Sequence, residues 1–174
     1  MAKGNGVPLA TGVRIASRVL GRLAPWCARV ALAGSVRRLR PTVHDVDLVV
    51  QPQWMSTPEL VRAARKVADE VTRASAESVI WKLVVEGVVV DVYLATVQSW
   101  GMTLLIRTGS AQHNVYLASK ARAMGMAMKY SDGCFEKLSS ATGKLEIHAY
   151  CPEEADVFKA LGMPWVDPED RERR

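Results

Sequence analysis

The 174-residue sequence has few cysteines, few aromatic residues and no long apolar run. Its three cysteines, Cys27, Cys134 and Cys151, are far apart and form no C-x-x-C pair, which excludes a disulfide framework and a zinc site of that type. We expect three buried thiols that act as small apolar side chains. No run of about 18 uncharged apolar residues exists, so no membrane-spanning helix is predicted. The N-terminal stretch lacks the apolar core of a signal peptide, so we expect an intracellular, soluble protein without a membrane partner.

What the sequence does contain is a large apolar fraction and an uneven distribution of charge. Hydrophobic residues make up 49%, and this length suits one domain or two small lobes with a real core. The net charge is +5, and residues 1–50 carry eight basic and two acidic side chains, whereas the last 24 carry four and seven. A basic front half favours a polyanionic partner, although many basic proteins never bind nucleic acid.

Hydrophobic periodicity predicts an alternation of helices and strands. In the first part we expect a helix over 8–24, strands over 27–33 and 45–51, and a helix over 58–74 with Thr57 as its N-cap. Residues 78–85 and 88–95 form a hairpin around Glu86 and Gly87. In the second part the predicted elements are a helix over 96–106, a helix over 110–124, a hairpin over 126–138 and a helix over 152–161. The fold class is therefore α+β.

Three aspartates lie on two predicted strands. Asp45 and Asp47 are two residues apart, so both carboxylates leave the same face, and a divalent cation would relieve their repulsion. Asp91 lies inside an apolar strand, where an isolated charge costs several kcal/mol unless it is paired or bound to metal. Three carboxylates on neighbouring strands form a hard oxygen site suited to Mg²⁺ or Mn²⁺. The alternative for Asp45 and Asp47 is two surface acids at a strand start.

A basic loop precedes the first two aspartates. Gly34 and Ser35 end a strand and open a turn where backbone N–H groups can approach an anion. Arg37, Arg38 and Arg40 add guanidinium groups that match phosphate oxygens. Taken alone, these arginines could form a solvated loop. Followed by D-x-D, they indicate a site for a nucleoside triphosphate.

The G-S turn, the D-x-D pair and the later Asp91 resemble the signature of the DNA polymerase β superfamily of nucleotidyltransferases. Two further motifs resemble the thumb of family X DNA polymerases specifically. The first is T-G-S-x-x-x-N, formed here by Thr108, Gly109, Ser110 and Asn114. The second is a C-terminal pattern formed by Leu161, Gly162, Pro164, Trp165, Pro168 and Arg171. The resemblance runs from about residue 8 to the end.

This resemblance implies a nucleotidyltransferase-type palm, a mixed β-sheet flanked by helices, over residues 1–104 and a small α+β thumb over 105–174. It implies that Asp45 and Asp47 hold two Mg²⁺ ions, or Mn²⁺, and that Asp91 holds the catalytic one and helps deprotonate the primer 3′-hydroxyl. Nucleotide-binding residues are then Gly34, Ser35, Arg38, Gly109 and Asn114, with His44 either facing the triphosphate or packing. Candidate DNA-binding residues are Arg37, Arg40, Arg107, Lys120 and Arg122.

The sequence also departs from the family pattern. The fingers and lyase domains are absent, so no deoxyribose-phosphate lyase activity is expected. Ile106 and Arg107 stand where an aromatic residue usually excludes the ribose 2′-hydroxyl, and Ala118 replaces the thumb arginine that checks the template base pair. Val89 replaces the arginine two residues before the third acid. The loss of the thumb arginine predicts weak fidelity, and the loss of the aromatic residue leaves the discrimination between ribose and deoxyribose open.

The predicted function is DNA-directed DNA polymerase activity, in which a dNTP extends a primer at gaps or ends with release of pyrophosphate. A monomer that binds DNA and dNTP is expected. Two alternatives remain open: a template-independent or non-DNA nucleotidyltransferase, and a non-catalytic nucleic-acid-binding relative.

Overall fold

A computed structural model describes residues 6–172. Residues 1–5 and 173–174 lie outside the described residues. Residues 1–5 belong to the N-terminal stretch in which no signal peptide is predicted. The chain divides into two compact units, Met1–Ala95 and Thr96–Arg174. The palm–thumb boundary predicted after residue 104 lies inside helix α4 (Trp100–Thr108), and it stays a prediction. Met102 and Leu105 of α4 are fully buried in the core of the second unit.

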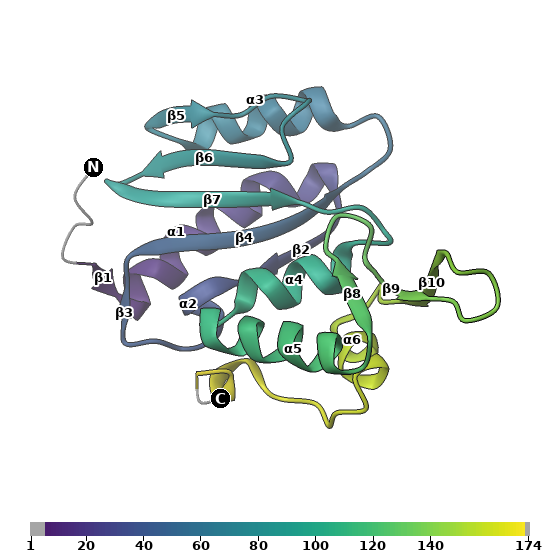
Figure 1. The fold of residues 1–174 in the computed structure, drawn as a ribbon. Coiled ribbons are helices and arrows are strands. Elements are labelled where there is room, and N and C mark those ends of the chain that lie inside the picture. The colour runs from purple at the N-terminus through teal and green to yellow at the C-terminus, as the bar shows by residue number, and fades with distance from the viewer. Residues whose placement is uncertain (1–5, 173–174) are drawn as a thin grey trace. The chain divides into compact units, whose positions relative to one another are not determined.

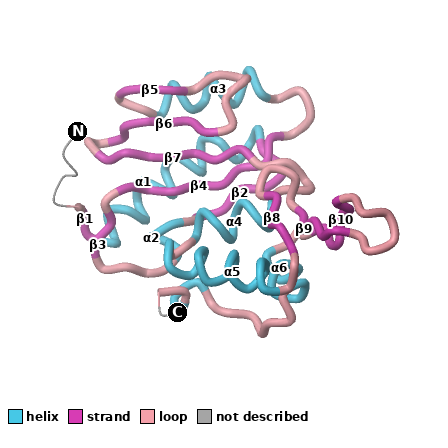
Figure 2. Tube along the Cα trace, in the orientation of Figure 1, coloured by secondary structure: helices cyan, strands magenta, loops and turns pink. Residues whose placement is uncertain are grey.

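The first unit is built on a five-stranded mixed sheet of order β2-β4-β7-β6-β5 (Figures 1 and 2). Only β4 and β7 run parallel, and the other neighbours are antiparallel. The strands are β2 (Cys27–Leu32), β4 (Asp45–Pro52), β5 (Glu70–Arg73), β6 (Ile80–Val85) and β7 (Val88–Leu94). A separate two-stranded pair joins β1 (Val7–Pro8) to β3 (Thr42–Val43). This sheet confirms the predicted α+β class.

Helices α1 (Leu9–Leu23) and α3 (Thr57–Val67) lie on the same face of this sheet (Figure 1). The buried stripe of α1, which includes Ile15 and Val19, packs into one core with Val46, Leu48 and Val90. Successive residues of a strand point to opposite faces, so every second residue of β4 and β7 faces these helices. Two short helices, η1 (Ala24–Trp26) and α2 (Gly34–Arg37), flank β2.

The helix predicted over 58–74 is wrong in its second half. Helix α3 ends at Val67, and Ala68 already has an extended backbone with φ −88° and ψ 144°. Residues 70–73 instead form β5 at the sheet edge, because pairing with β6 satisfies their backbone groups. The N-cap is Ser56 rather than Thr57, and the Ser56 hydroxyl donates to the carbonyl of Trp26 at 2.7 Å instead of capping α3.

The predicted hairpin of β6 and β7 is confirmed, with Glu86 and Gly87 at its turn. Both residues have positive φ, 53° and 75°, as a tight two-residue turn of this hand requires. Arg14 and Arg18 of α1 bind the Glu86 carboxylate, at 2.8 and 3.0 Å from Oε1. This clamp attaches the turn to the helix.

In its described residues, the second unit contains three α-helices, one short 3₁₀ helix and a three-stranded antiparallel sheet of order β10-β9-β8. Its strands are β8 (Met126–Lys129), β9 (Cys134–Leu138) and β10 (Leu145–Tyr150). Besides α4, its helices are α5 (Ala111–Ala123), α6 (Glu154–Ala160) and the short η2 (Pro168–Asp170). The predicted hairpin over 126–138 is confirmed, and β10 adds a third strand. The helix predicted over 96–106 begins only at Trp100.

The three cysteines are free and buried, as predicted. Burial raises the pKa of the Cys27 thiol to about 11 and that of Cys151 to about 12, which keeps both protonated. Within residues 6–172, no helix is long and apolar enough to span a membrane.

Candidate active site

The three aspartates lie on one face of the first unit's sheet. In the parallel pairing of β4 and β7, Asp47 is the register partner of Asp91, and Asp45 lies two residues before Asp47. The residues next to them along the strands are fully buried and face α1 and α3; these are Val46, Leu48, Val90 and Val92. The three carboxylates therefore point to the opposite face.

Lys82 of β6 is the immediate partner of Asp91. Its ammonium group lies 2.8 and 3.0 Å from the two carboxylate oxygens, and the two residues face each other in the antiparallel register. Asp91 is only 9% exposed, so an ionised carboxylate there needs such a counter-charge.

Sequence analysis missed Lys82, although a signal was present. Lys82 is the only charged residue of the predicted strand over 78–85. It lies four residues before Glu86, and Asp91 lies four residues after Gly87. A two-residue turn pairs positions that are equidistant from it.

Asp47 is held between Tyr93 and Gly34. The Tyr93 hydroxyl donates to Asp47 Oδ1 at 3.2 Å, and the backbone N–H of Ala33 donates to the Asp47 carbonyl at 2.9 Å. Gly34 has a φ of +57°, and a methyl group on it would overlap the Asp47 carboxylate. Glycine is therefore required both by the backbone conformation and by the close approach of this acid.

The loop between Gly34 and Asp45 carries the predicted phosphate-binding residues. Ser35 Oγ is buried and has no hydrogen-bond partner, which is unusual because buried hydroxyls are nearly always paired. Arg37 and Arg38 are half-buried on and just after α2, Arg40 is exposed, and His44 is exposed directly before β4. An unpaired buried hydroxyl beside these guanidinium groups suits an anionic ligand.

The chemistry of these residues fits a divalent cation, although the acids are not gathered around a common point. Among residues 6–172, no three His, Cys, Asp or Glu side chains are close enough together to hold a metal ion. Asp91 is bound by Lys82, and Asp47 accepts a hydrogen bond from Tyr93. The donors are all carboxylate oxygens, as Mg²⁺ and Mn²⁺ prefer. Asp45, Asp47 and Asp91 are thus the residues that would hold these ions.

The predicted thumb residues lie in the second unit. Gly109, with φ +73°, ends α4, and the Ser110 hydroxyl caps α5 by accepting from the His113 N–H at 3.3 Å. The Asn114 side chain donates to the Ile106 carbonyl at 2.8 Å, while its Oδ1 is buried without a hydrogen-bond partner.

The cationic residues predicted for the thumb lie on the same pair of helices. Arg107 belongs to α4 and Lys120 and Arg122 to α5; both arginines are exposed and Lys120 is half-buried. That any residue of the second unit acts together with the acids stays a prediction.

Comparison with known proteins shows which proteins this chain resembles. Residues 103–172 match the DNA polymerase beta thumb family. Two ternary complexes of Leishmania infantum polymerase beta have the same fold. The one with a primer/template has a TM-score of 0.76, 19% identity and coverage of 98% of this chain and 78% of that one. The gap complex has a TM-score of 0.75, 17% identity and coverage of 98% and 72%.

A curated relative extends the match to the rest of the chain. The DNA polymerase/3′-5′ exonuclease PolX of Bacillus subtilis (strain 168) is 28% identical over 175 residues, which cover 95% of this chain. The chain spans 28% of the length of that relative. The resemblance to family X DNA polymerases is confirmed, in a partial form that contains the palm-like sheet and the thumb.

Proposed function

We propose that this chain is a metal-dependent nucleotidyltransferase that extends a DNA primer from a dNTP, as a gap-filling polymerase of low fidelity. The observation that carries the proposal is the register of β4 and β7, in which Asp47 and Asp91 are neighbours and Asp45 shares their face. The unpaired Ser35 hydroxyl next to this face supports a bound triphosphate. The names of the relatives, which are polymerases and DNA complexes, agree with it.

In this proposal each side chain has a stated task. Asp45 and Asp47 would hold two divalent cations and Asp91 the catalytic one of them, and these ions when bound neutralise the charge that develops on the reacting phosphate. Ser35 and Arg38 bind the triphosphate and orient it for in-line attack. Asp91 helps to deprotonate the primer 3′-hydroxyl. The ion pair between Lys82 and Asp91 must open before this proton transfer. Gly109 and Asn114 contact the incoming nucleotide.

Primer extension with single-residue variants tests this function. Asp47→Ala and Asp91→Ala should each lower extension of a gapped duplex by at least about 10³-fold, because charge neutralisation is the main chemical contribution. Glu70→Gln, which alters an exposed acid on β5 of the same sheet, should leave the rate unchanged. Retained extension in either aspartate variant that is still folded by circular dichroism rejects the proposal.

A template-independent transferase is the second candidate. Arg107 is exposed where the family carries an aromatic residue, and Ala118 carries no side chain able to reach a template base. Extension of a gapped duplex, an open primer–template and a single strand should be compared, with each nucleotide and with Mg²⁺ or Mn²⁺. Strong dependence on a template discards this candidate. The third candidate is a non-catalytic nucleic-acid-binding relative, and the Lys82–Asp91 ion pair is compatible with it. Any cation-dependent incorporation of a nucleotide excludes this candidate.

A further inference from the structure

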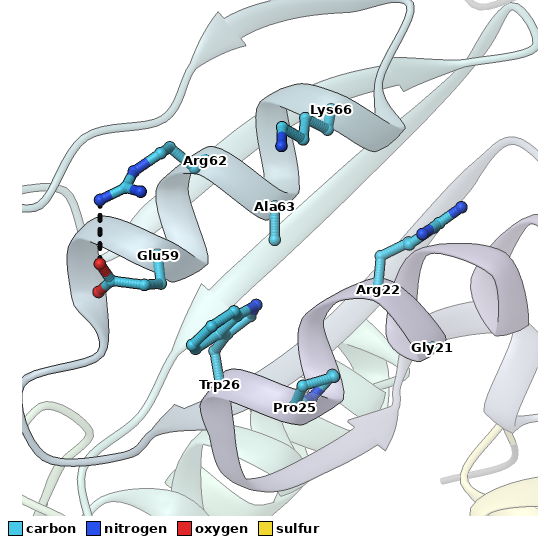
Figure 3. Close-up of a pocket in the computed structure, with 8 residues that line it drawn as sticks. All are labelled: Gly21, Arg22, Pro25, Trp26, Glu59, Arg62, Ala63 and Lys66. Carbon is cyan, nitrogen blue, oxygen red and sulfur yellow. Dashed lines mark hydrogen bonds and ion pairs between the residues drawn. The ribbon is translucent and has the colours of Figure 1, made fainter.

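A pocket of about 630 Å³ lies between the C-terminal end of α1, η1 and α3 (Figure 3). These helices cover the face of the sheet opposite to the one that carries the three aspartates. The pocket adjoins the end of β4, because the backbone N–H of Gln53, just after that strand, donates to the Trp26 carbonyl at 3.0 Å. At about 3.3 Å per residue, Asp47 and Pro52 are roughly 17 Å apart along β4. The pocket is therefore separate from the candidate active site.

The pocket carries more positive than negative charge. Arg22, Arg62 and Lys66 line it together with one acid, Glu59. Arg62 pairs with Glu59 at 2.9 Å, whereas the side chains of Arg22 and Lys66 form no hydrogen bond or ion pair within residues 6–172. Both lie in the last turn of a helix, where a cation also stabilises the helix dipole. That role accounts for the charges, but not for the aromatic surface beside them.

An indole ring lies in the middle of these charges. Trp26 is 37% exposed, and Figure 3 shows it between the Arg62–Glu59 pair on one side and Arg22 with Lys66 on the other. The loop that follows β4 is attached to the Trp26 carbonyl through Ser56 at 2.7 Å, and it exposes 92% of Trp54 and 81% of Met55. An exposed tryptophan among cations offers a flat stacking surface next to phosphate-binding groups.

We propose that this pocket binds a segment of single-stranded nucleic acid, away from the reacting end of any primer. Trp26 stacks on a base, and Arg22 and Lys66 pair with the phosphates on either side of it. The volume suits about one nucleotide. An acidic peptide would use the two cations but has no flat ring for the indole, so a nucleic acid fits both observations.

Binding of a fluorescein-labelled dodecamer, (dT)12 in one arm and (rU)12 in the other, tests the proposal by anisotropy in EDTA. Trp26→Ala should weaken binding by about tenfold through loss of stacking. The double variant Arg22→Gln/Lys66→Gln should also reduce the slope of log Kd against log salt by about 1.4, as expected for two lost phosphate contacts. The two arms show whether deoxyribose or ribose strands are preferred.

The matched control is Lys137→Gln/Lys144→Gln, which removes the same charge from exposed positions of the second unit and should change neither affinity nor slope. Irradiation of a strand that contains 5-iodouracil should crosslink to Trp26, as detected by mass spectrometry of the tryptic peptide of residues 23–29.

The proposal is overturned if both pocket variants bind like the wild type, or if the crosslink maps elsewhere. It is also overturned if poly-glutamate of equal charge displaces the strand as well as unlabelled (dT)12 does, since the surface would then select charge alone. If Trp26→Ala does not fold, the double variant Arg22→Gln/Lys66→Gln decides, because both residues are exposed. An unchanged slope of log Kd against log salt in this variant then overturns the proposal. None of these measurements depends on catalysis, so failure here is distinct from failure of the polymerase function.

Discussion

At the scale of single residues, the site depends on what neutralises Asp91. A carboxylate in a nearly buried strand position is stable only with a counter-charge, and Lys82 supplies it with two short contacts. The same ammonium group competes with any cation for those oxygens. Lys82 therefore stabilises the folded state without a cation and opposes cation binding at Asp91, although the sequence motifs do not include it.

Substitution of Lys82 separates these two effects. Lys82→Met should lower the free energy of unfolding by about 1–3 kcal/mol without divalent cations, because Asp91 is left without its partner. Added Mg²⁺ should then stabilise this variant more than the wild type, since a ligand that binds only the folded state raises its stability. Urea unfolding with and without Mg²⁺ measures both, with Lys144→Met as the control. Equal stabilisation of Lys82→Met and the wild type by Mg²⁺ would contradict competition between Lys82 and the cation for Asp91.

Gly34 gives a second prediction at this scale. Gly34→Ala should move the Asp47 carboxylate and lower primer extension by about 10²-fold or more, in addition to a backbone cost of about 1–2 kcal/mol for positive φ. Gly143→Ala is the matched control, because Gly143 also has positive φ, +66°, but open space around it. It should lose similar stability and keep its activity. Equal activity of the two variants would show that Asp47 tolerates the methyl group.

At the scale of elements, the β6–β7 hairpin is the unit that presents Asp91, and its turn is clamped to α1. Arg14 and Arg18 hold Glu86, and the hydrogen bonds from Arg14 lower the pKa of that carboxyl to about 2. A carboxyl whose pKa is depressed in the folded state adds stability above its unfolded pKa of about 4.3 and loses it as pH falls toward the folded value.

The clamp therefore predicts a pH dependence of stability. The melting temperature of the wild type should exceed that of Glu86→Gln at pH 6, and the difference should shrink between pH 4.5 and 2, where Glu86 becomes protonated. Thermal melts followed by circular dichroism measure this difference, with Glu70→Gln as an exposed control. A difference that is constant across this range would show that the clamp contributes no pH-dependent stability.

At the scale of the whole molecule, each unit has its own core, and the second unit is closed by its C-terminal segment. Arg171 is fully buried and donates to Glu154 at 2.7 Å and to the Val166 carbonyl at 3.1 Å. Its guanidinium also lies 5.0 and 5.5 Å from the rings of Trp165 and Phe158. The Ser110 hydroxyl donates to the Arg171 carbonyl at 2.8 Å, which ties the start of α5 to this segment.

Loss of this residue should destabilise one unit selectively. Arg171→Met leaves Glu154 as a buried charge without its partner, and we expect a loss of about 3–5 kcal/mol in the second unit. Amide hydrogen exchange should quicken in α5 and α6, while the amides of β4 stay protected. Lys159→Met on the surface of α6 is the control. Equal acceleration in both units would show that they unfold together.

The sequence by itself determined the local structure and the identity of the chemical groups. Periodicity and turn residues predicted α1, β4, the hairpin at Glu86 and helix α5, because these signals lie within a few residues of one another. The motifs around Gly34, Asp45 and Asp47 also indicated the family before any coordinates. Helix propensity, in contrast, extended α3 over residues that form β5, since only a neighbouring strand can satisfy edge backbone groups.

Only the tertiary structure decided how distant segments face one another. The parallel pairing of β4 and β7 places Asp47 beside Asp91, although more than forty residues separate them in the chain. It also showed that Lys82 pairs with Asp91, and that Arg171 is fully buried. Burial and counter-charge depend on the solvent that a side chain loses when the chain packs, and no local pattern records that loss.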